Sequence, residues 1–372
     1  MILDISDQEF KNIFDNKSLW LPIQWDNNDF SSTLQKLFKK YIDTVKKSCK
    51  GCYIEENRNC SCENILSIER VCELLVTTIQ QYLNGFPAQA FETFGQVMCC
   101  LQQVPLKTYE KSIFEQLQGP RYRDSLNLYR VACVNENTLY DRSRVFHTPY
   151  SLRSKVSTNR YSIAGFPSLY LGTSLELCYE EVHPNPSEEF IIASRFQLER
   201  DFEFNNTEIK VIELAIKPQD FLERINRDDN TIKNRVVSRR VLESSRVRRA
   251  YLFWYPLIAA CSFIRVNKKD PFAAEYIIPQ LLMQWVRTEI GSPKRRYKRL
   301  IGIRYFSCAS VKASDMGFNY VFPTNGQDRK RGFCPVLSKA FKLTRPYFLH
   351  EYSSICSWEN ALKNDTDLEF ID

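Results

Sequence analysis

The chain has 372 residues, a formal net charge of +7 and 13 cysteines. A hydrophobic content of 44% and an aromatic content of 13% are those of a globular protein with ample core. The acidic start, MILDISDQEF, lacks the features of a signal peptide, and the longest apolar stretch, residues 251–264, is too short to cross a bilayer. We therefore expect a cytoplasmic protein without a membrane partner, built from two domains or from one domain with an appendage.

Residues 1–115 are predicted to form a mainly helical N-terminal domain. Apolar residues recur at helical spacing over 30–45 and 68–83, and the second segment is closed by Asn84-Gly85. Pro87 stands where a first helical turn begins, which predicts a third helix over 88–101.

Four cysteines fall within a short polar loop between the first two of these helices. Cys49, Cys52, Cys60 and Cys62 offer four thiolates, the number that a tetrahedral structural zinc site requires. The Cys-x-Cys half is unusual and the loop is short, so free reduced thiols are an equal alternative.

Residues 146–181 contain the most informative pattern of the chain. Residues 168–171 are predicted to form a strand, and Thr173 with Glu176 has the spacing of a capping box, which predicts a helix from Ser174. Glu181 falls inside the apolar arc of this helix. Because a buried carboxylate is costly unless it is paired, Glu181 is expected to have either a structural arginine partner or a chemical function.

The spacing of Arg160, Tyr170 and Glu181 within RYSIAGFPSLYLGTSLELCYEEV resembles the RES domain. Residues 302–323 resemble the late strand of that family, which maps its serine to Ser307, and residues 126–131 resemble its first strand, which bears Arg130. The resemblance covers about residues 126–323 and implies an α+β fold with an ADP-ribosyltransferase-like mixed β core. It also implies the activity of the family, whose members are NAD-degrading toxins of bacterial toxin–antitoxin systems.

Each of these residue types has a place in the cleavage of the nicotinamide–ribose bond. A carboxylate such as Glu181 stabilises an oxocarbenium-like transition state, and an aromatic face such as Tyr170 stacks on the cationic nicotinamide ring. Arginines such as Arg160 and Arg130 grip a pyrophosphate, and the hydroxyl of Ser307 orients ribose or phosphate. The structural alternatives are a core aromatic, a solvated loop charge and a strand hydroxyl bonded to the backbone.

Further residues are candidates for contact with the NAD substrate. His147 stands beside a proline, where a structural hydrogen-bonding role is the commoner one. Arg153 follows in the same segment, and Asn319 lies on a predicted strand over 319–322.

The remaining segments alternate between predicted strands and helices. We expect strands over 190–198, 210–216, 300–308 and 341–351, a buried helix over 251–264 and a helix over 280–287 after Pro279, whereas the acidic tail 363–372 is expected to end loosely. The arginine-rich residues 226–250 suit a solvated helix better than a nucleic-acid surface. No GxGxxG or GxxxxGK loop is present, which argues against a Rossmann fold.

The predicted organisation is a helical domain over 1–115, a RES-like catalytic domain over 116–350 and a C-terminal tail over 351–372. The favoured function is NAD degradation by hydrolysis or phosphorolysis, as a bacterial toxin or antiphage effector. It would be held inactive by an antitoxin or immunity partner, or by its own N-terminal domain. The alternatives are ADP-ribosylation of a protein target and a nucleic-acid-binding or scaffold protein without enzymatic activity.

Overall fold

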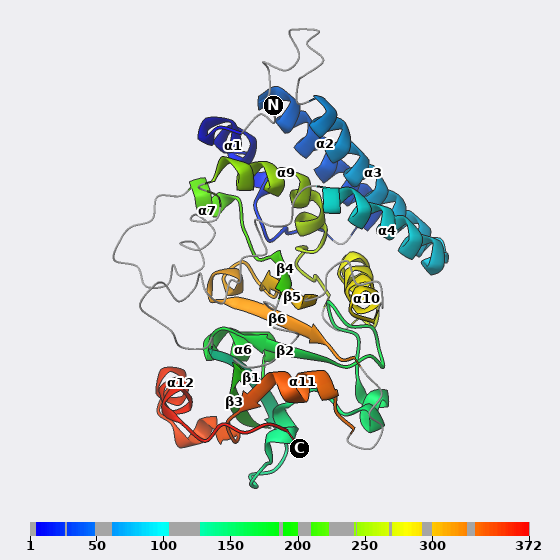
Figure 1. Cartoon of the computed structure of the whole chain (residues 1–372). Helices are drawn as coiled ribbons and strands as arrows, with labels where there is room; N and C mark the ends of the chain where they lie inside the picture. Colours follow the sequence, from blue (N-terminus) through cyan, green and yellow to red (C-terminus); the bar gives the residue numbers. More distant parts are fainter. Residues whose placement is uncertain are drawn as a thin grey trace. The chain divides into compact units, whose positions relative to one another are not determined.

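The structure is a computed structural model in which helices accompany one mixed β-sheet (Figure 1). The predicted α+β class, with a mixed sheet after a helical N-terminal region, is confirmed. The structure describes residues 5–26, 28–48, 62–103, 127–185, 189–199, 210–222, 242, 244–267, 270–291, 300–325 and 332–371.

The elements have the following bounds. The described α-helices are α1 (Asp7–Phe14), α2 (Phe30–Ser48), α3 (Cys62–Leu83), α4 (Pro87–Gln103), α6 (Leu175–Val182), α7 (Gln219–Leu222), α9 (Ser245–Ala260), α10 (Ile277–Gly291), α11 (Pro335–Ala340) and α12 (Ile355–Asn364). The strands are β1 (Asn127–Val134), β2 (Ser168–Gly172), β3 (Phe190–Leu198), β4 (Lys210–Leu214), β5 (Leu300–Phe306), β6 (Phe318–Pro323), β7 (Phe341–Leu343) and β8 (Tyr347–Phe348). None of these helices combines the length and apolarity that crossing a membrane requires.

Contacts divide the chain into two compact units. The first consists of residues 1–109 and 216–285, and the second of residues 110–215 and 286–372. The predicted domain boundaries at residues 116 and 351 stay predictions. In this division, residues 216–285 belong with the N-terminal helices rather than with the sheet.

Buried aromatic side chains explain this grouping. The ring of Phe14 in α1 lies 5.0 Å from that of Tyr255 in α9, and Tyr255 lies 4.4 Å from Tyr41 in α2. The hydroxyl of Tyr41 donates to the Leu252 carbonyl, and that of Tyr255 donates to the Leu19 carbonyl. Large rings whose polar ends are hydrogen-bonded stabilise a core strongly, so α9 packs on α1 and α2.

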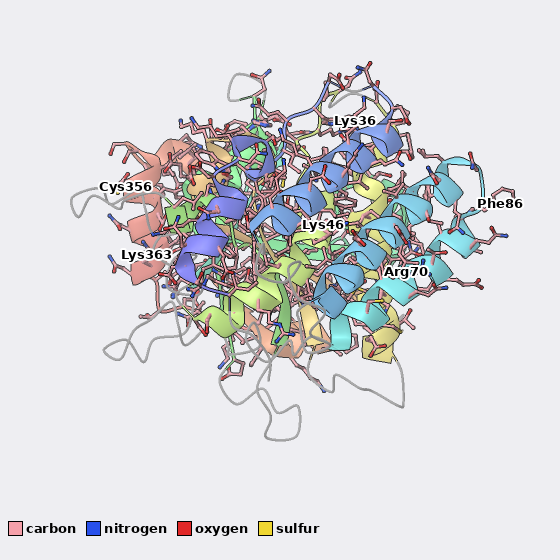
Figure 2. The ribbon with its side chains drawn as sticks, turned by 90° about the horizontal axis from the view of Figure 1, so that it is seen from above. Lys36, Lys46, Arg70, Phe86, Cys356 and Lys363 are labelled. Carbon is pink, nitrogen blue, oxygen red and sulfur yellow. The ribbon has the colours of Figure 1, made fainter. Side chains whose placement is uncertain are left out.

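The helices α2, α3 and α4 lie side by side in the first unit (Figure 2). Lys36 is exposed on α2, whereas Lys46 pairs with Glu69 of α3. Phe86 is 53% exposed in the turn between α3 and α4, where Figure 2 shows it at the end of the pair. Leu34 and Phe38 of α2 are buried at helical spacing, as are Leu75 and Ile79 of α3, which confirms the amphipathic periodicity predicted for these two helices.

The sheet belongs to the second unit and has the strand order β4-β5-β6-β2-β1-β3-β7, with β8 beside β3. β4 and β5 are parallel, whereas every other described pair is antiparallel. The predicted strands are confirmed with shifts of one to three residues at several ends. The predicted strand over 341–351 is two short strands, β7 and β8.

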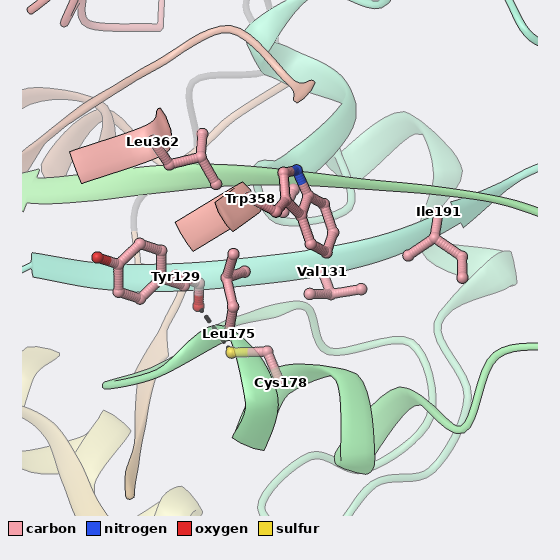
Figure 3. Close-up of a cluster of buried hydrophobic side chains, with 8 residues drawn as sticks. Tyr129, Val131, Leu175, Cys178, Ile191, Trp358 and Leu362 are labelled. Carbon is pink, nitrogen blue, oxygen red and sulfur yellow. Dashed lines mark hydrogen bonds between the residues drawn. The ribbon is translucent and has the colours of Figure 1, made fainter. Parts of the chain in front are cut away.

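One core cluster holds α6 and α12 against β1 and β3 (Figure 3). Trp358 of α12 is fully buried and its indole N–H donates to the Tyr347 carbonyl at 3.2 Å. Cys178 of α6 donates from Sγ to the Tyr129 carbonyl of β1 at 3.2 Å. The same cluster therefore positions α6, the helix that carries Glu181.

The prediction of a loosely ending tail is wrong. Arg142, which is 9% exposed, pairs with Asp367 at 2.8 Å and with Glu369 at 2.7 Å. Glu369 also exchanges two backbone hydrogen bonds with Leu343 of β7. Acidic residues that suggested a solvated end are thus the partners of a buried arginine from a distant part of the chain.

Candidate functional site

Three neighbouring strands present polar side chains on one face of the sheet. Asn319 of β6 is paired with Gly172 of β2 on one side and with Tyr305 of β5 on the other. Tyr170 stands two residues before Gly172. Because paired residues and residues two apart share a face, Tyr170, Asn319 and Tyr305 point to the same side of the sheet.

The helix α6 begins directly after β2 and passes over this face. Its N-cap is Ser174, whose hydroxyl accepts from the Leu177 N–H, so the helix starts one residue later than predicted. A Cβ added to Gly172 would lie 2.6 Å from the sulfur of Cys178 and 3.5 Å from Oδ1 of Asn319. The glycine is therefore what allows α6 to approach the strand so closely.

Glu181 meets Asn319 at the end of α6. Oε1 of the glutamate accepts a hydrogen bond of 2.8 Å from Nδ2 of Asn319. The prediction that Glu181 lies on a buried face is wrong, because its side chain is exposed. The helix ends at Val182, and His183 follows as its C-cap with φ 47°.

Tyr305 is the residue of this cluster that the sequence reasoning missed. Its ring lies 4.7 Å from that of Tyr161, the neighbour of Arg160. Burial raises the pKa of Tyr305 well above its usual value, the negative charge of Glu181 raises it further, and the positive charge of Arg160 lowers it. Arg160, Tyr170 and Glu181 therefore lie within electrostatic range of one phenol, which gathers the three predicted residues in one region.

Tyr170 is held by a hydrogen-bonded group of side chains. Its hydroxyl lies 2.8 Å from Oγ of Ser162, which lies 3.0 Å from Oγ of Ser168. Arg287 of α10 donates to Ser168 in turn, at 3.2 Å. The sequence offered no signal for Arg287, because its contacts with Pro167 and Ser168 lie more than a hundred residues away in the chain.

Arg130 and Arg153, two of the residues predicted to contact NAD, are placed differently. Nη1 of Arg130 is buried without a hydrogen-bond partner among the described residues. Burial lowers the pKa of Arg130 to about 10 and the charge of Arg144 lowers it too, whereas Cys178 and Tyr170 act in the opposite direction. Arg153 is exposed, and its guanidinium lies 5.8 Å from the ring centre of Phe166. Arg130 follows Tyr129, the register partner of Gly172, so it lies on the face of the sheet opposite to Tyr170 and Asn319.

Ser307 is fully buried just after β5. Its Oγ accepts a hydrogen bond of 3.1 Å from the Ala309 N–H. Among the described contacts, none joins Ser307 to Glu181 or Tyr170. Its predicted catalytic role stays a prediction, and the backbone contact is the structural alternative considered for it.

His147 is fully buried between two backbone groups. Its Nδ1 donates to the Thr148 carbonyl at 2.8 Å, and its Nε2 accepts from the Cys334 N–H at 2.9 Å. Both ring nitrogens are therefore hydrogen-bonded, with one as donor and the other as acceptor, which is the arrangement of a neutral imidazole. Burial is the main cause that lowers the pKa of His147 to about 4. This arrangement suits the structural role better than contact with a substrate.

The buried imidazole should make the protein sensitive to acid. An unfolded histidine binds a proton below about pH 6.5, whereas His147 in the folded protein resists it down to about pH 4. The free energy of unfolding should therefore fall as the pH decreases through this window, by on the order of 3 kcal/mol from this residue. Urea titrations from pH 7 to 4 should show a smaller loss for His147→Gln than for the wild type. The exposed His350→Gln should keep the wild-type slope, and an equal slope for both variants would contradict the assignment.

The predicted zinc ligands lie mostly outside the described residues. Cys49, Cys52 and Cys60 are not described, and Cys62 begins α3 with a side chain that is not described. Within the described ranges, no group of three or more His, Cys, Asp or Glu side chains could hold a metal ion. The zinc site therefore stays a prediction.

Comparison with known proteins gives a toxin-like relative. The chain is 26% identical over 338 residues to a protein of Bacillus subtilis (strain 168) named "Putative toxin YopC". The aligned region covers 88% of this chain and 67% of that protein. No protein-family model and no solved structure matches the chain.

Proposed function

We propose that the protein is a toxin that cleaves the nicotinamide–ribose bond of NAD. The observation that carries the proposal is that Tyr170, Asn319 and Tyr305 share one face of the sheet, where Glu181 is bonded to Asn319 and the charge of Arg160 acts on Tyr305. The similarity to a protein named as a toxin supports the biological role. The resemblance of residues 160–181 to the RES domain supports the choice of NAD as substrate.

The proposed mechanism divides the work among these side chains. The carboxylate of Glu181, oriented by Asn319, stabilises the positive charge that develops on the ribose as nicotinamide leaves. Tyr170 stacks on the nicotinamide ring, while Arg160 holds the pyrophosphate. Water or phosphate then attacks C1′ and completes hydrolysis or phosphorolysis.

The exposure of Glu181 is compatible with this role. A carboxylate that meets a bound substrate must be accessible in the unliganded protein, and substrate binding itself excludes water. The same exposure leaves room for a protein side chain as acceptor, so ADP-ribosylation of a target protein is the alternative.

We also propose that an antitoxin partner controls the site, as the toxin role requires a means of restraint.

Incubation of the purified chain with NAD tests the proposal. We expect free nicotinamide to accumulate together with ADP-ribose, or with its 1″-phosphate when phosphate is supplied. With NAD labelled in the adenine, label that stays on added protein substrates would select the alternative. Absence of nicotinamide release by folded protein, with and without phosphate or protein acceptors, would overturn both.

A further inference from the structure

Arg287 makes a set of contacts that converge on the strand of Tyr170. From the last turns of α10, its Nη1 donates to the Thr324 carbonyl at 2.8 Å. Its Nη2 donates to the Pro167 carbonyl at 2.8 Å and to Oγ of Ser168 at 3.2 Å. One guanidinium thus holds the start of β2 and the end of β6 together, with a planar fork that a lysine cannot reproduce.

The direction of the hydrogen bonds leads from Arg287 to Tyr170. A guanidinium only donates, so Oγ of Ser168 accepts from it. Oγ of Ser162 also donates to Ser168, at 3.0 Å. Ser162 has a single hydroxyl hydrogen, which this bond uses, so the 2.8 Å contact with Tyr170 requires the phenol to donate.

The surroundings make this order of hydrogen bonds persistent. Ser162 is 3% exposed and Ser168 is 7% exposed, so water competes little for their hydroxyls. The ring centre of Phe166 lies 5.7 Å from the guanidinium carbon of Arg287 and limits its movement. Burial lowers the pKa of Arg287, yet an arginine remains charged at any pH at which the protein is folded.

We infer that Arg287 is a positioning residue for the candidate site: through Ser168 and Ser162 it fixes the direction of the Tyr170 hydroxyl and the orientation of its ring. The inference rests on the proposed function, in which this ring stacks on nicotinamide. Arg287 does not touch the substrate in this account and acts only through the two serines.

Kinetics of NAD cleavage give the first test. Because a misoriented contact group reduces turnover, Arg287→Met should lower kcat about 10- to 100-fold, with a smaller effect on KM. Ser162→Ala removes the hydrogen bonds between Ser168 and Tyr170 but keeps those of Arg287 to the carbonyls of residues 167 and 324, so it should also lower kcat. The double variant Arg287→Met with Ser162→Ala should have a kcat little lower than that of Arg287→Met alone. Arg287→Lys should have a kcat between those of Arg287→Met and the wild type. Arg345→Met, at an exposed arginine of the same unit, is the matched control and should be unchanged.

A measurement independent of activity separates this inference from the proposed function. With 3-fluorotyrosine incorporated, the ¹⁹F resonance of Tyr170 is identified by its absence in Tyr170→Phe. It should shift or broaden in both Arg287→Met and Ser162→Ala, and it should stay in place in Arg345→Met. An unmoved resonance in folded Arg287→Met and Ser162→Ala would overturn the inference. If wild-type protein releases no nicotinamide, the proposed function fails and the resonance alone decides the positioning role.

Discussion

Replacement of Glu181 by glutamine should reduce NAD cleavage by about 10²- to 10³-fold, the loss seen when one group that stabilises transition-state charge is removed. The amide keeps the size of the side chain and its oxygen can still accept from Asn319, so the contact across α6 and β6 is retained. The negative charge is lost, and with it the stabilisation of the electron-poor sugar. The effect should appear mainly in kcat, measured as release of nicotinamide at saturating NAD.

Glu180 provides a matched control for this variant. It precedes Glu181 on the same helix and is partly exposed, but the hydrogen bond to Asn319 belongs to Glu181. Glu180→Gln changes the net charge by the same amount and should leave kcat near the wild-type value. Equal activity of the two variants would remove Glu181 from the mechanism and leave a structural role for its contact with Asn319.

The sequence predicted the strands and the helix of this site better than it predicted which side chains are exposed. Residues 168–171 and 319–322 are short runs rich in apolar and aromatic residues, which is typical of buried strands, and both strands are present as β2 and β6. Gly172 and the N-cap Ser174 explain why the helix follows at once. The exposure of Glu181 could not be predicted from the apolar arc, because α6 has 8 residues and the residues that end it, Glu181 and Val182, are exposed together.

Residues that act through distant contacts were not predictable from local pattern. Tyr305 stands two residues before Ser307, and only the pairing of β5 with β6 shows which of them lies beside Asn319. Arg142 reaches the tail across more than two hundred residues. By contrast, α1 had a local signal that we did not use, the capping box formed by Ser6 and Glu9.

A buried ion pair between β4 and β5 was missed for the same reason. Glu213 and Arg304 are register partners, and their Oε2 and Nη1 atoms lie 2.7 Å apart with side chains 2% and 0% exposed. The Ala215 N–H donates to the other carboxylate oxygen, and the ring centre of Phe318 lies 3.8 Å from the guanidinium carbon. Each charge is therefore surrounded by protein and compensated chiefly by the other.

Removal of one partner should destabilise the protein strongly. Arg304→Met leaves the Glu213 carboxylate buried and unpaired, which should lower the free energy of unfolding by about 3–5 kcal/mol. Glu213→Leu should have a similar cost for the same reason. Urea denaturation followed by circular dichroism measures the effect, and the exposed Lys363→Met should change the value by less than about 1 kcal/mol.

The double variant distinguishes a need for charge from a need for volume. If the cost comes from an unpaired buried charge, Glu213→Leu with Arg304→Met should be more stable than either single variant, because both charges leave the interior together. If instead the stems and their ring contacts carry the stability, the two losses should add. Recovery of stability in the double variant would mean that the ion pair contributes little net stability. The presence of the pair between β4 and β5 would then have to be explained by strand register or by function. Function is relevant because β5, which carries Arg304, also carries Tyr305 of the candidate site.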